Sequence, residues 1–470
     1  MGIFEKFYSV QGRRMLPLAL AFLLLLSACG SRARELSDNG IVHLTYAAVG
    51  EEAVGRAQAL AKSFNIRHQD IKVEVQEYIG ENGRSAKDLL ITEILAGNIP
   101  DIFDLGDGLP GGDCLPYPLL VQKGYLEDLW PYIEKDPDLG REGVVEALLK
   151  AAEVDGGLYA AFGSALICTT IGAESLIGSR KSWTLADIRE IFDSMPDGST
   201  VLPYSAVRDT TFKVMLTYSL EGYVDRTAST CSFDSDEFRS ALDFVREFPE
   251  SFDMEAAGGF MAVALERADR YLHGYQMLEY WTISHPVDIQ EIDNSFGLGG
   301  KAVCIGYPTE SGLSGNWFRS LQTLGMSSAC RNKEAAWGFI RELFLPQYEN
   351  MDALRKLDHI TLSEHGVPVN RSDYDLLKKA AANGTLSRIM STTVGGPYGF
   401  PGTNYRKATQ EEIARFDELV NDTRVISLYD QALYNIVYEA AGPYFAGHKT
   451  MEETIALVEN RVNLYLNEQK

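Results

Sequence analysis

After residue 40 the chain alternates between two hydrophobic periods. Apolar residues that repeat every second position are typical of strands, and apolar residues three and four positions apart are typical of helices. The resulting prediction is strands at 41–46, 71–78 and 101–105, with helices at 51–64 and 86–96 between them. Ser85 and Asp88 form a capping pair at the start of the second helix. This β-α-β-α-β order favours a mostly parallel sheet with helices on both faces.

Strand patterns return at 163–172, 301–307 and 321–326, whereas the remaining segments read mainly as helices. Capping pairs mark three of the helix starts, namely Thr184 with Asp187, Asp234 with Glu237, and Thr450 with Glu453. Because sheet-forming segments occur both early and late in a chain of this length, we expect two lobes between which the chain crosses more than once.

The first 30 residues have a different character. A basic segment precedes an apolar run at 15–26, which is shorter than the roughly 20 residues of a membrane-spanning helix. This arrangement is typical of a secretory signal peptide. The exit of the run, Leu-Ser-Ala-Cys at 26–29, resembles the lipobox of bacterial lipoproteins. The resemblance implies cleavage before Cys29 and a lipid on its thiol, with an ordinary signal peptide and a chance cysteine as the alternative.

Composition is that of an ordinary globular protein, with 45% hydrophobic and 23% charged residues. The net charge is −23, and removal of residues 1–28, which carry one acid and three bases, leaves −25. Such acidity argues against nucleic acid or an anionic lipid surface as the main partner. Five cysteines follow Cys29 without zinc-binding spacing, so we expect buried thiols with at most one or two disulfides.

Seven stretches in order resemble the extracellular solute-binding lipoproteins of ABC importers, the class that includes maltodextrin-binding proteins. They are GNIPDI at 97–102, KGYLEDL at 123–129, DGGLY at 155–159, WTLADI at 183–188, CIGYPT at 304–309, KEAAWGFI at 333–340, and residues 439–468. Each stretch is weak alone, but their order behind a lipobox makes the resemblance specific over nearly the whole mature chain. Gly-Asn-Trp at 315–317 departs from the usual glycine pair of the family.

The resemblance implies a two-lobed α/β fold of the class II periplasmic-binding-protein type, in which a hinge lets the lobes close on a small solute. The expected divisions are a signal peptide at 1–28, a tether at 29–40, lobe 1 at 41–158 and 296–345, and lobe 2 at 159–295 and 346–470. The expected role is a monomeric, lipid-anchored subunit on the extracellular or periplasmic side. It would capture a carbohydrate, foremost an oligosaccharide, for a membrane permease, without a cofactor.

Three patterns suggest other chemistry, and local context argues against each. Residues 106–111 match GxGxxG, but nearby prolines oppose the helix that a dinucleotide site requires, so we interpret them as a loop at the end of a strand. Asp104, Asp107 and Asp113 could pair as glycosidase carboxylates do, but acidic loops are common in so acidic a chain. Residues 136–147 begin like a calcium loop and then lack its glycine and glutamate. We predict no catalytic residue and no metal site.

Aromatic side chains are the main candidates for contact with a solute, because the CH faces of sugars stack on aromatic rings. Trp281 lies in a segment that resembles one whose tryptophan often faces the cleft in the family, and Trp317 is expected in a loop. Packing in the core is the alternative for any single ring. Trp183 and Trp337 lie at helical core spacing and are expected to be structural. The predicted ligand-binding residues are Glu51, Asp107, Phe162, Tyr280, Trp281, Tyr307, Trp317 and Tyr398.

Three other functions stay open from the sequence. An acidic cleft would also suit a polyamine or another cationic solute. The chain could be a surface glycoside hydrolase, or it could report solute binding to a membrane kinase instead of a transporter.

Overall fold

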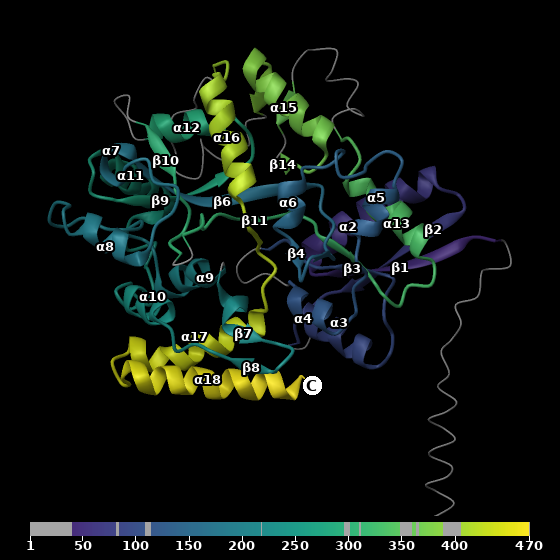
Figure 1. Cartoon of the computed structure of the whole chain (residues 1–470), viewed down its shortest axis with the longest axis horizontal. Coiled ribbons are helices and arrows are strands. Elements are labelled where there is room, and N and C mark those ends of the chain that lie inside the picture. The colour runs from purple at the N-terminus through teal and green to yellow at the C-terminus, as the bar shows by residue number, and fades with distance from the viewer. Residues whose placement is uncertain are drawn as a thin grey trace, which may run out of the picture.

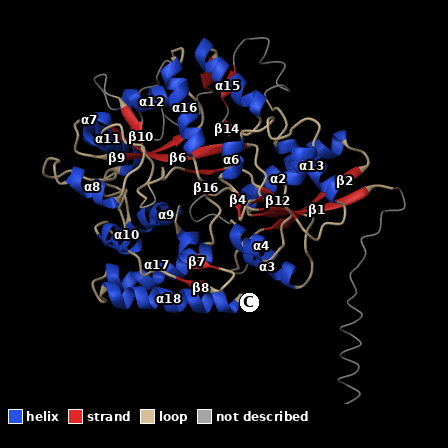
Figure 2. Ribbon diagram, in the orientation of Figure 1, coloured by secondary structure: helices blue, strands red, loops and turns tan. Residues whose placement is uncertain are grey.

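The computed structural model describes residues 40–80, 84–108, 114–217, 219–295, 301–309, 312–347, 360–362, 366–388 and 406–469. The leader, the lipidation candidate Cys29 and the ligand-binding candidate Tyr398 lie outside these residues. Most of the strands gather in two sheets, and helices surround both of them (Figure 2).

The first sheet, at the right of Figure 1, has the strand order β12-β3-β1-β2. β1 (Val42–Val49) pairs in parallel with β2 (Ile71–Tyr78) and with β3 (Ile102–Asp104), as the β-α-β-α-β pattern predicts. β12 (Leu324–Met326) runs antiparallel to β3. The helices α2 (Glu51–Arg67), α3 (Ala86–Leu95) and α13 (Lys333–Ile340) pack on this sheet. The Ser85 side chain caps α3 by accepting from the Asp88 amide.

The second sheet is built around the long strand β6 (Ser164–Ala173) and is mostly antiparallel. Ile167 on β6 pairs with both Ile283 and Phe318, so β9 (Leu278–Ile283) and β11 (Trp317–Arg319) lie on opposite sides of β6. The other members are β10 (Ala302–Cys304) and β14 (Val367–Pro368), both antiparallel to β6, and β16 (Val425–Ile426), parallel to β11.

Helices complete both halves. Those near the first sheet are α4 (Tyr117–Gln122) and α5 (Trp130–Lys135), with the hairpin β4 (Glu153–Val154) and β5 (Gly157–Leu158). α6 (Glu146–Lys150) contacts the helix at 410–422 beside the second sheet. Around the second sheet are α7 (Glu174–Ile177), α8 (Leu185–Phe192), α9 (Arg208–Thr217), α10 (Asp236–Arg246), α11 (Gly259–Leu272), α12 (Asp288–Ser295), α15 (Arg371–Asn383) and α16 (Gln410–Asp422). α17 (Gln431–Phe445) and α18 (Met451–Glu468) pack against each other along the lower edge of Figure 1.

The remaining short elements are the 3-10 helices η1 (Leu220–Tyr223) and η2 (Arg341–Leu343), the hairpin β7 (Val224–Asp225) and β8 (Thr230–Cys231), and the parallel pair β13 (Ile360–Leu362) and β15 (Leu386–Arg388).

Two of the three helix caps predicted in the later part of the chain are present. Thr184 and Thr450 each form a reciprocal capping box, with Asp187 and Glu453 respectively. At the start of α10 the capping residue is Ser235 and not Asp234 as predicted, because the Ser235 hydroxyl accepts a hydrogen bond from the Phe238 amide.

The segment at 296–345, in which the chain returns to the first sheet, is divided between the two sheets differently from the predicted lobe boundaries. Residues 296–345 were expected in lobe 1, but β10 and β11 belong to the second sheet, and only β12 and α13 join the first. The apolar pattern at 301–307 identifies a strand but carries no information on its partner, which is the end of β6. The backbone bridge between Ala161 and Leu324 marks where two crossing segments meet.

Buried residues form one large core that extends through both sheets, a second core among α9, α10, α17 and α18, a third that includes Trp183 of the α8 region, and a small fourth cluster around Trp317. Trp183 and Trp337 are buried, as expected of structural tryptophans. The five cysteines that the structure describes are all free thiols. Among the described residues, no helix combines the length and the hydropathy needed to cross a membrane.

Candidate functional site

The segments that follow β1 and β3 form one wall of the candidate site, because both strands end at the same edge of the first sheet. Gly50, with a φ of 93°, turns the chain from β1 into α2. After β3 the chain continues through residues 105–108, where Gly106 and Gly108 have φ values of 104° and 69°. Residues other than glycine rarely adopt such angles. The first two glycines of the GxGxxG match therefore serve a turn, as predicted for a loop.

The carboxyl group of Asp104 is buried beneath this turn. Its Oδ1 accepts from the Gly106 amide at 2.9 Å, and its Oδ2 accepts from the Tyr46 hydroxyl at 3.3 Å. The Gln322 side chain donates in turn to the Tyr46 hydroxyl at 3.1 Å. Burial raises the pKa of Asp104 to about 6, and the Gly106 amide opposes that rise. The carboxyl therefore holds the turn in place and is not presented to solvent.

The turn at 105–108 also touches the second half of the molecule. The Ser427 hydroxyl donates to the Gly108 carbonyl oxygen at 2.9 Å. A Cβ on Gly108 would lie 2.7 Å from the Ser427 carbonyl oxygen and 2.9 Å from the Arg319 Cβ. Only glycine allows this close approach, so Gly108 brings the first wall against β11 and the segment that follows β16.

A row of three aromatic rings lies on one face of the second sheet. Tyr280 stacks on Tyr307 with 6.3 Å between ring centroids, and Tyr307 stacks on Trp317 with 6.1 Å. We call these three residues the aromatic row. Cys168 of β6 and Val214 of α9 pack against it. Tyr307 and Trp317 are 5% and 3% exposed, whereas Tyr280 is half-buried.

The row forms because Gly315 lets two segments approach closely. Gly315 bridges to Gly306 and to Tyr307, and a Cβ at position 315 would lie 2.0 Å from the Tyr307 carbonyl oxygen. The sequence Gly-Asn-Trp at 315–317, which departs from the usual glycine pair, thus supplies both the close approach and the last ring of the row.

Arg319 extends the same face of the sheet. Side chains two positions apart on a strand point to the same side, so Arg319 lies on the face that carries Trp317. Arg319 is half-buried, and it makes no hydrogen bond or ion pair with any other described residue. A half-buried guanidinium without a partner has unused donors, which makes it a strong candidate to contact a polar solute.

Tyr280 and Trp281 were both predicted to contact the solute, and the structure separates them. They are neighbours on β9 and therefore point to opposite faces. Tyr280 joins the aromatic row, whereas Trp281 is 6% exposed and lies in the main core. Tyr307 and Trp317 were expected in loops. Trp317 lies instead in β11, and both rings pack on each other inside the second half.

The remaining predicted residues lie in different surroundings. Phe162 has no exposed surface and packs on Phe318 at 5.0 Å between centroids, so it is a core residue in this conformation. Glu51 is exposed at the first turn of α2. Asp107 is half-buried in the turn and directly precedes Gly108, the glycine that approaches Arg319.

Sequence reasoning missed Arg319 and Ser427. Neither lies in a recognisable motif, and a strand of three residues such as β11 is too short for its periodicity to show which side chains share a face. No group of three or more His, Cys, Asp or Glu residues within the described ranges is arranged to hold a metal ion.

Comparisons with known proteins identify the fold. A scan against protein-family models finds no match, and a search of curated protein sequences finds none either. The solved structure of the sugar-binding protein MalE from Xanthomonas citri matches 91% of this chain and 98% of its own, with 17% identity and a TM-score of 0.52. Two designed esterases, one a cysteine esterase and one improved by directed evolution, each match 91% of this chain and 99% of their own, with 16% and 15% identity and TM-scores of 0.50.

At identities this low the likeness shows the fold and not the activity. The match to MalE covers 91% of this chain and 98% of MalE, so the similarity is not confined to one half of the fold. The two-lobed α/β fold expected from the sequence is confirmed, since the architecture of this chain is similar to that of MalE.

Proposed function

We propose that this chain is the substrate-binding subunit of an ABC importer, which captures a carbohydrate outside the cell and delivers it to a membrane permease. The observation that carries the proposal is the aromatic row beside Arg319, which has no hydrogen-bond or ion-pair partner among the described residues, where the turn at 105–108 meets the second half. Sites between two lobes are common in binding proteins, because closure buries the solute. The shared fold with a sugar-binding protein supports the same role.

The chemistry of these residues suits a sugar. Aromatic rings supply apolar surface for the CH faces of a pyranose, and the guanidinium of Arg319 supplies several donors for hydroxyl or carboxylate oxygens. Tyr280 is the member of the row with the most accessible surface, so it is the ring that we assign to stacking. The inner rings, Tyr307 and Trp317, support it from behind.

We propose binding without turnover. A glycosidase needs two carboxyl groups that face the substrate at a set separation. Asp104, one of the candidate acids, is 2% exposed and accepts hydrogen bonds from the Gly106 amide and the Tyr46 hydroxyl. Incubation with candidate oligosaccharides should therefore return them intact. Steady hydrolysis that is lost on Asp104→Asn would contradict this part of the proposal.

A thermal-shift screen of the protein against neutral sugars, acidic sugars and polyamines tests the function directly. A ligand present at 100 times its Kd stabilises the folded state by about 2.7 kcal/mol, which a melting curve detects. We expect an oligosaccharide to raise the melting temperature. A response to polyamines alone would assign the protein to a cationic solute.

Arg319→Gln then locates the site once a sugar has been found. Because hydrogen bonds to charged groups contribute about 1.5–3 kcal/mol, the variant should bind roughly 10- to 100-fold more weakly. Its melting temperature without ligand should stay near that of the wild type, since Arg319 has no described partner to lose. Unchanged affinity in a normally folded variant would move the site away from β11.

We also propose that the mature protein is held at the membrane by a lipid on Cys29, a residue outside the described ranges. The support is the Leu-Ser-Ala-Cys sequence at 26–29 behind a short apolar run. Two or three acyl chains suffice for stable anchoring, because each buried methylene contributes about 0.8 kcal/mol. We further propose that the protein acts as a monomer.

A further inference from the structure

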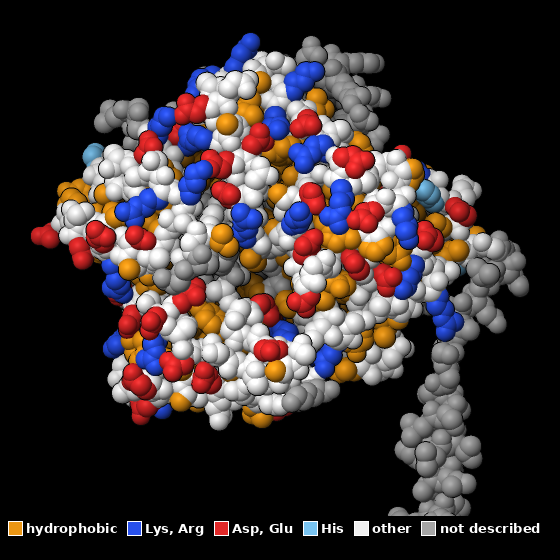
Figure 3. All heavy atoms as spheres, in the orientation of Figure 1, with side chains coloured by type: hydrophobic (Ala, Val, Ile, Leu, Met, Phe, Trp, Pro, Cys, Tyr) orange, Lys and Arg blue, Asp and Glu red, His pale blue; other side chains and the backbone are white. Residues whose placement is uncertain are grey.

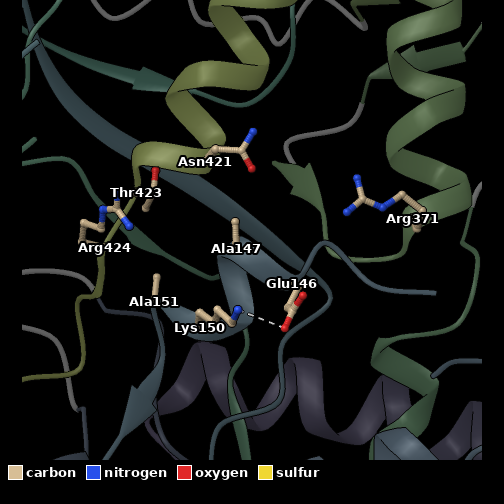
Figure 4. Close-up of a pocket in the computed structure, with 8 residues that line it drawn as sticks. All are labelled: Glu146, Ala147, Lys150, Ala151, Arg371, Asn421, Thr423 and Arg424. Carbon is tan, nitrogen blue, oxygen red and sulfur yellow. Dashed lines mark ion pairs between the residues drawn. The ribbon is translucent and has the colours of Figure 1, made fainter. Parts of the chain in front are cut away.

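A cavity of about 370 Å³ lies apart from the candidate site, where the α6 segment meets α15 and the end of α16 (Figure 4). Its lining residues are Glu146, Ala147, Lys150, Ala151, Arg371, Asn421, Thr423 and Arg424. Arg371 and Arg424 extend toward the cavity from opposite sides, and Lys150 approaches it from α6. A cavity of this size is within the range of small-molecule sites, which begins at about 300 Å³.

The lining charges are mostly positive although the chain as a whole carries −23. Glu146 is the one acidic residue of the lining, and its Oε1 is already shared by Lys150 Nζ at 3.1 Å and by Arg141 Nη1 at 2.8 Å. Within the described chain, the Arg371 guanidinium donates to the Val144 carbonyl oxygen at 3.3 Å, lies 5.6 Å from the centroid of the Tyr374 ring, and pairs with no carboxylate. Arg424 has one distant acid, Asp422, at 3.7 Å.

The neutral polar residues of the lining do not supply the missing negative charge. Thr423 donates its hydroxyl to the Leu419 carbonyl oxygen at 2.9 Å, and the Asn421 amide donates to the Asp417 carbonyl oxygen at 2.8 Å. Two guanidinium groups therefore face one cavity, and most of their donors have no acceptor among the described residues. Arginine forks match the oxygens of phosphate and carboxylate groups in a bidentate manner.

A second cavity, of about 600 Å³ between α8 and α10, has equal numbers of positive and negative side chains in its lining and serves as a comparison. Its two arginines, Arg189 and Arg246, share the lining with Asp243 and Glu247. Arg189 pairs with Glu247 at 2.8 Å. The contrast identifies the excess of positive charge in the first cavity as a feature of that cavity and not of surface arginines in general.

We propose that the cavity lined by Lys150, Arg371 and Arg424 binds a small multivalent oxyanion of the phosphate class. This site is separate from the proposed carbohydrate site. Lys150 comes from the segment before β6, and the two arginines come from the C-terminal quarter of the chain. The bound anion thus joins segments that are distant in sequence. Ala151, at the cavity wall, accepts from the Ile426 amide at 2.9 Å, which places the site directly behind β16.

Isothermal titration of the intact protein in detergent micelles with inorganic phosphate, at constant ionic strength in chloride, tests the proposal. We expect saturable binding at one site. Arg371→Gln and Arg424→Gln should each weaken phosphate binding about tenfold, because each removes charge-assisted hydrogen bonds. Ala147→Glu, which places a carboxylate within the cavity, should weaken it at least tenfold. Arg189→Gln, in the balanced cavity, is the matched control and should leave phosphate affinity unchanged.

Several results would overturn the proposal. One is the absence of saturable binding up to tens of millimolar phosphate. Another is an affinity that Arg371→Gln and Arg424→Gln leave unchanged while lowering the melting temperature, since the two side chains would then only stabilise the fold. A third arm uses phosphatidylglycerol in the micelles. Competition with phosphate that disappears in Arg371→Gln would assign the cavity to a lipid headgroup and not to a free anion.

Discussion

Trp281→Ala distinguishes a core tryptophan from a cleft tryptophan. Trp281 is 6% exposed, lies on β9 opposite Thr169 of β6, and packs within the main core. A tryptophan buries up to about 250 Å². At about 25 cal/mol per Å² the transfer free energy reaches roughly 6 kcal/mol, and measured losses for such truncations are about 3–5 kcal/mol. We therefore expect the free energy of unfolding to fall by about 3–5 kcal/mol.

Urea denaturation followed by circular dichroism measures this loss without relying on tryptophan fluorescence. Trp281→Phe keeps much of the buried surface and should lose clearly less. Carbohydrate affinity, measured below the unfolding transition, should stay within about threefold of the wild type. A Trp281→Ala protein with the urea midpoint of the wild type and a tenfold weaker affinity would refute the reasoning, because the ring would then stack on the solute. Arg319→Gln should show the opposite pattern, with normal stability and weak binding.

Three further outcomes follow from the same structure. Burial raises the pKa of Asp104 to about 6 from its ordinary value of 3.8, so the folded state holds this proton more tightly and stability should fall as the pH rises from about 4 to 6. Asp104→Asn should remove this pH dependence from the urea midpoints, and an unchanged pH dependence would contradict the assignment. Gly108→Ala should destabilise more than Gly97→Ala in urea, because both glycines have positive φ but only Gly108 has neighbours within 4 Å of a new Cβ; equal losses would show that backbone strain alone matters. Cys29→Ser should release the protein from membranes or leave it unprocessed, and fatty-acid labelling of a membrane-bound variant would disprove the anchor.

Elements with strong local signals could be predicted from the sequence. The parallel pairing of β1 with β2 and β3 follows from the β-α-β-α-β order, since parallel neighbours need a helical crossover. The capping boxes at Thr184 and Thr450 follow from residues three positions apart, because both partners of each hydrogen bond lie within one helical turn.

Pairings between distant segments could not be predicted in the same way. β10 and β11 join the second sheet, against the expected division, because antiparallel partners are chosen by packing across more than a hundred residues of chain. A strand of three residues has too little pattern to indicate its partner or its buried face. Tyr280 and Trp281 illustrate the consequence: the segment was identified as important, but only the strand assignment shows that one ring faces the row and the other the core.

The candidate site depends on such distant pairings. Arg319 reaches it only because β11 pairs with β6 on one side and with β16 on the other. A lone arginine in a polar stretch has no sequence signal, whereas a half-buried guanidinium with no partner in the described part of the chain has a physical meaning. The aromatic row likewise needs Gly315, whose role is visible only beside the Tyr307 carbonyl oxygen.

The segment at 320–323 connects the candidate site to the relative position of the two sheets. β11 ends at Arg319 in the second sheet, and β12 begins at Leu324 in the first. The Thr323 carbonyl oxygen accepts from the Leu105 amide at 2.8 Å, so the last part of the segment is already fixed to the turn beneath the site. On this crossing, any rotation of one sheet against the other must therefore be absorbed within a few residues of Arg319. A solute held by Arg319 of the second sheet and by the turn at 105–108 of the first sheet would favour closure, because it would bind both halves next to the segment that connects them.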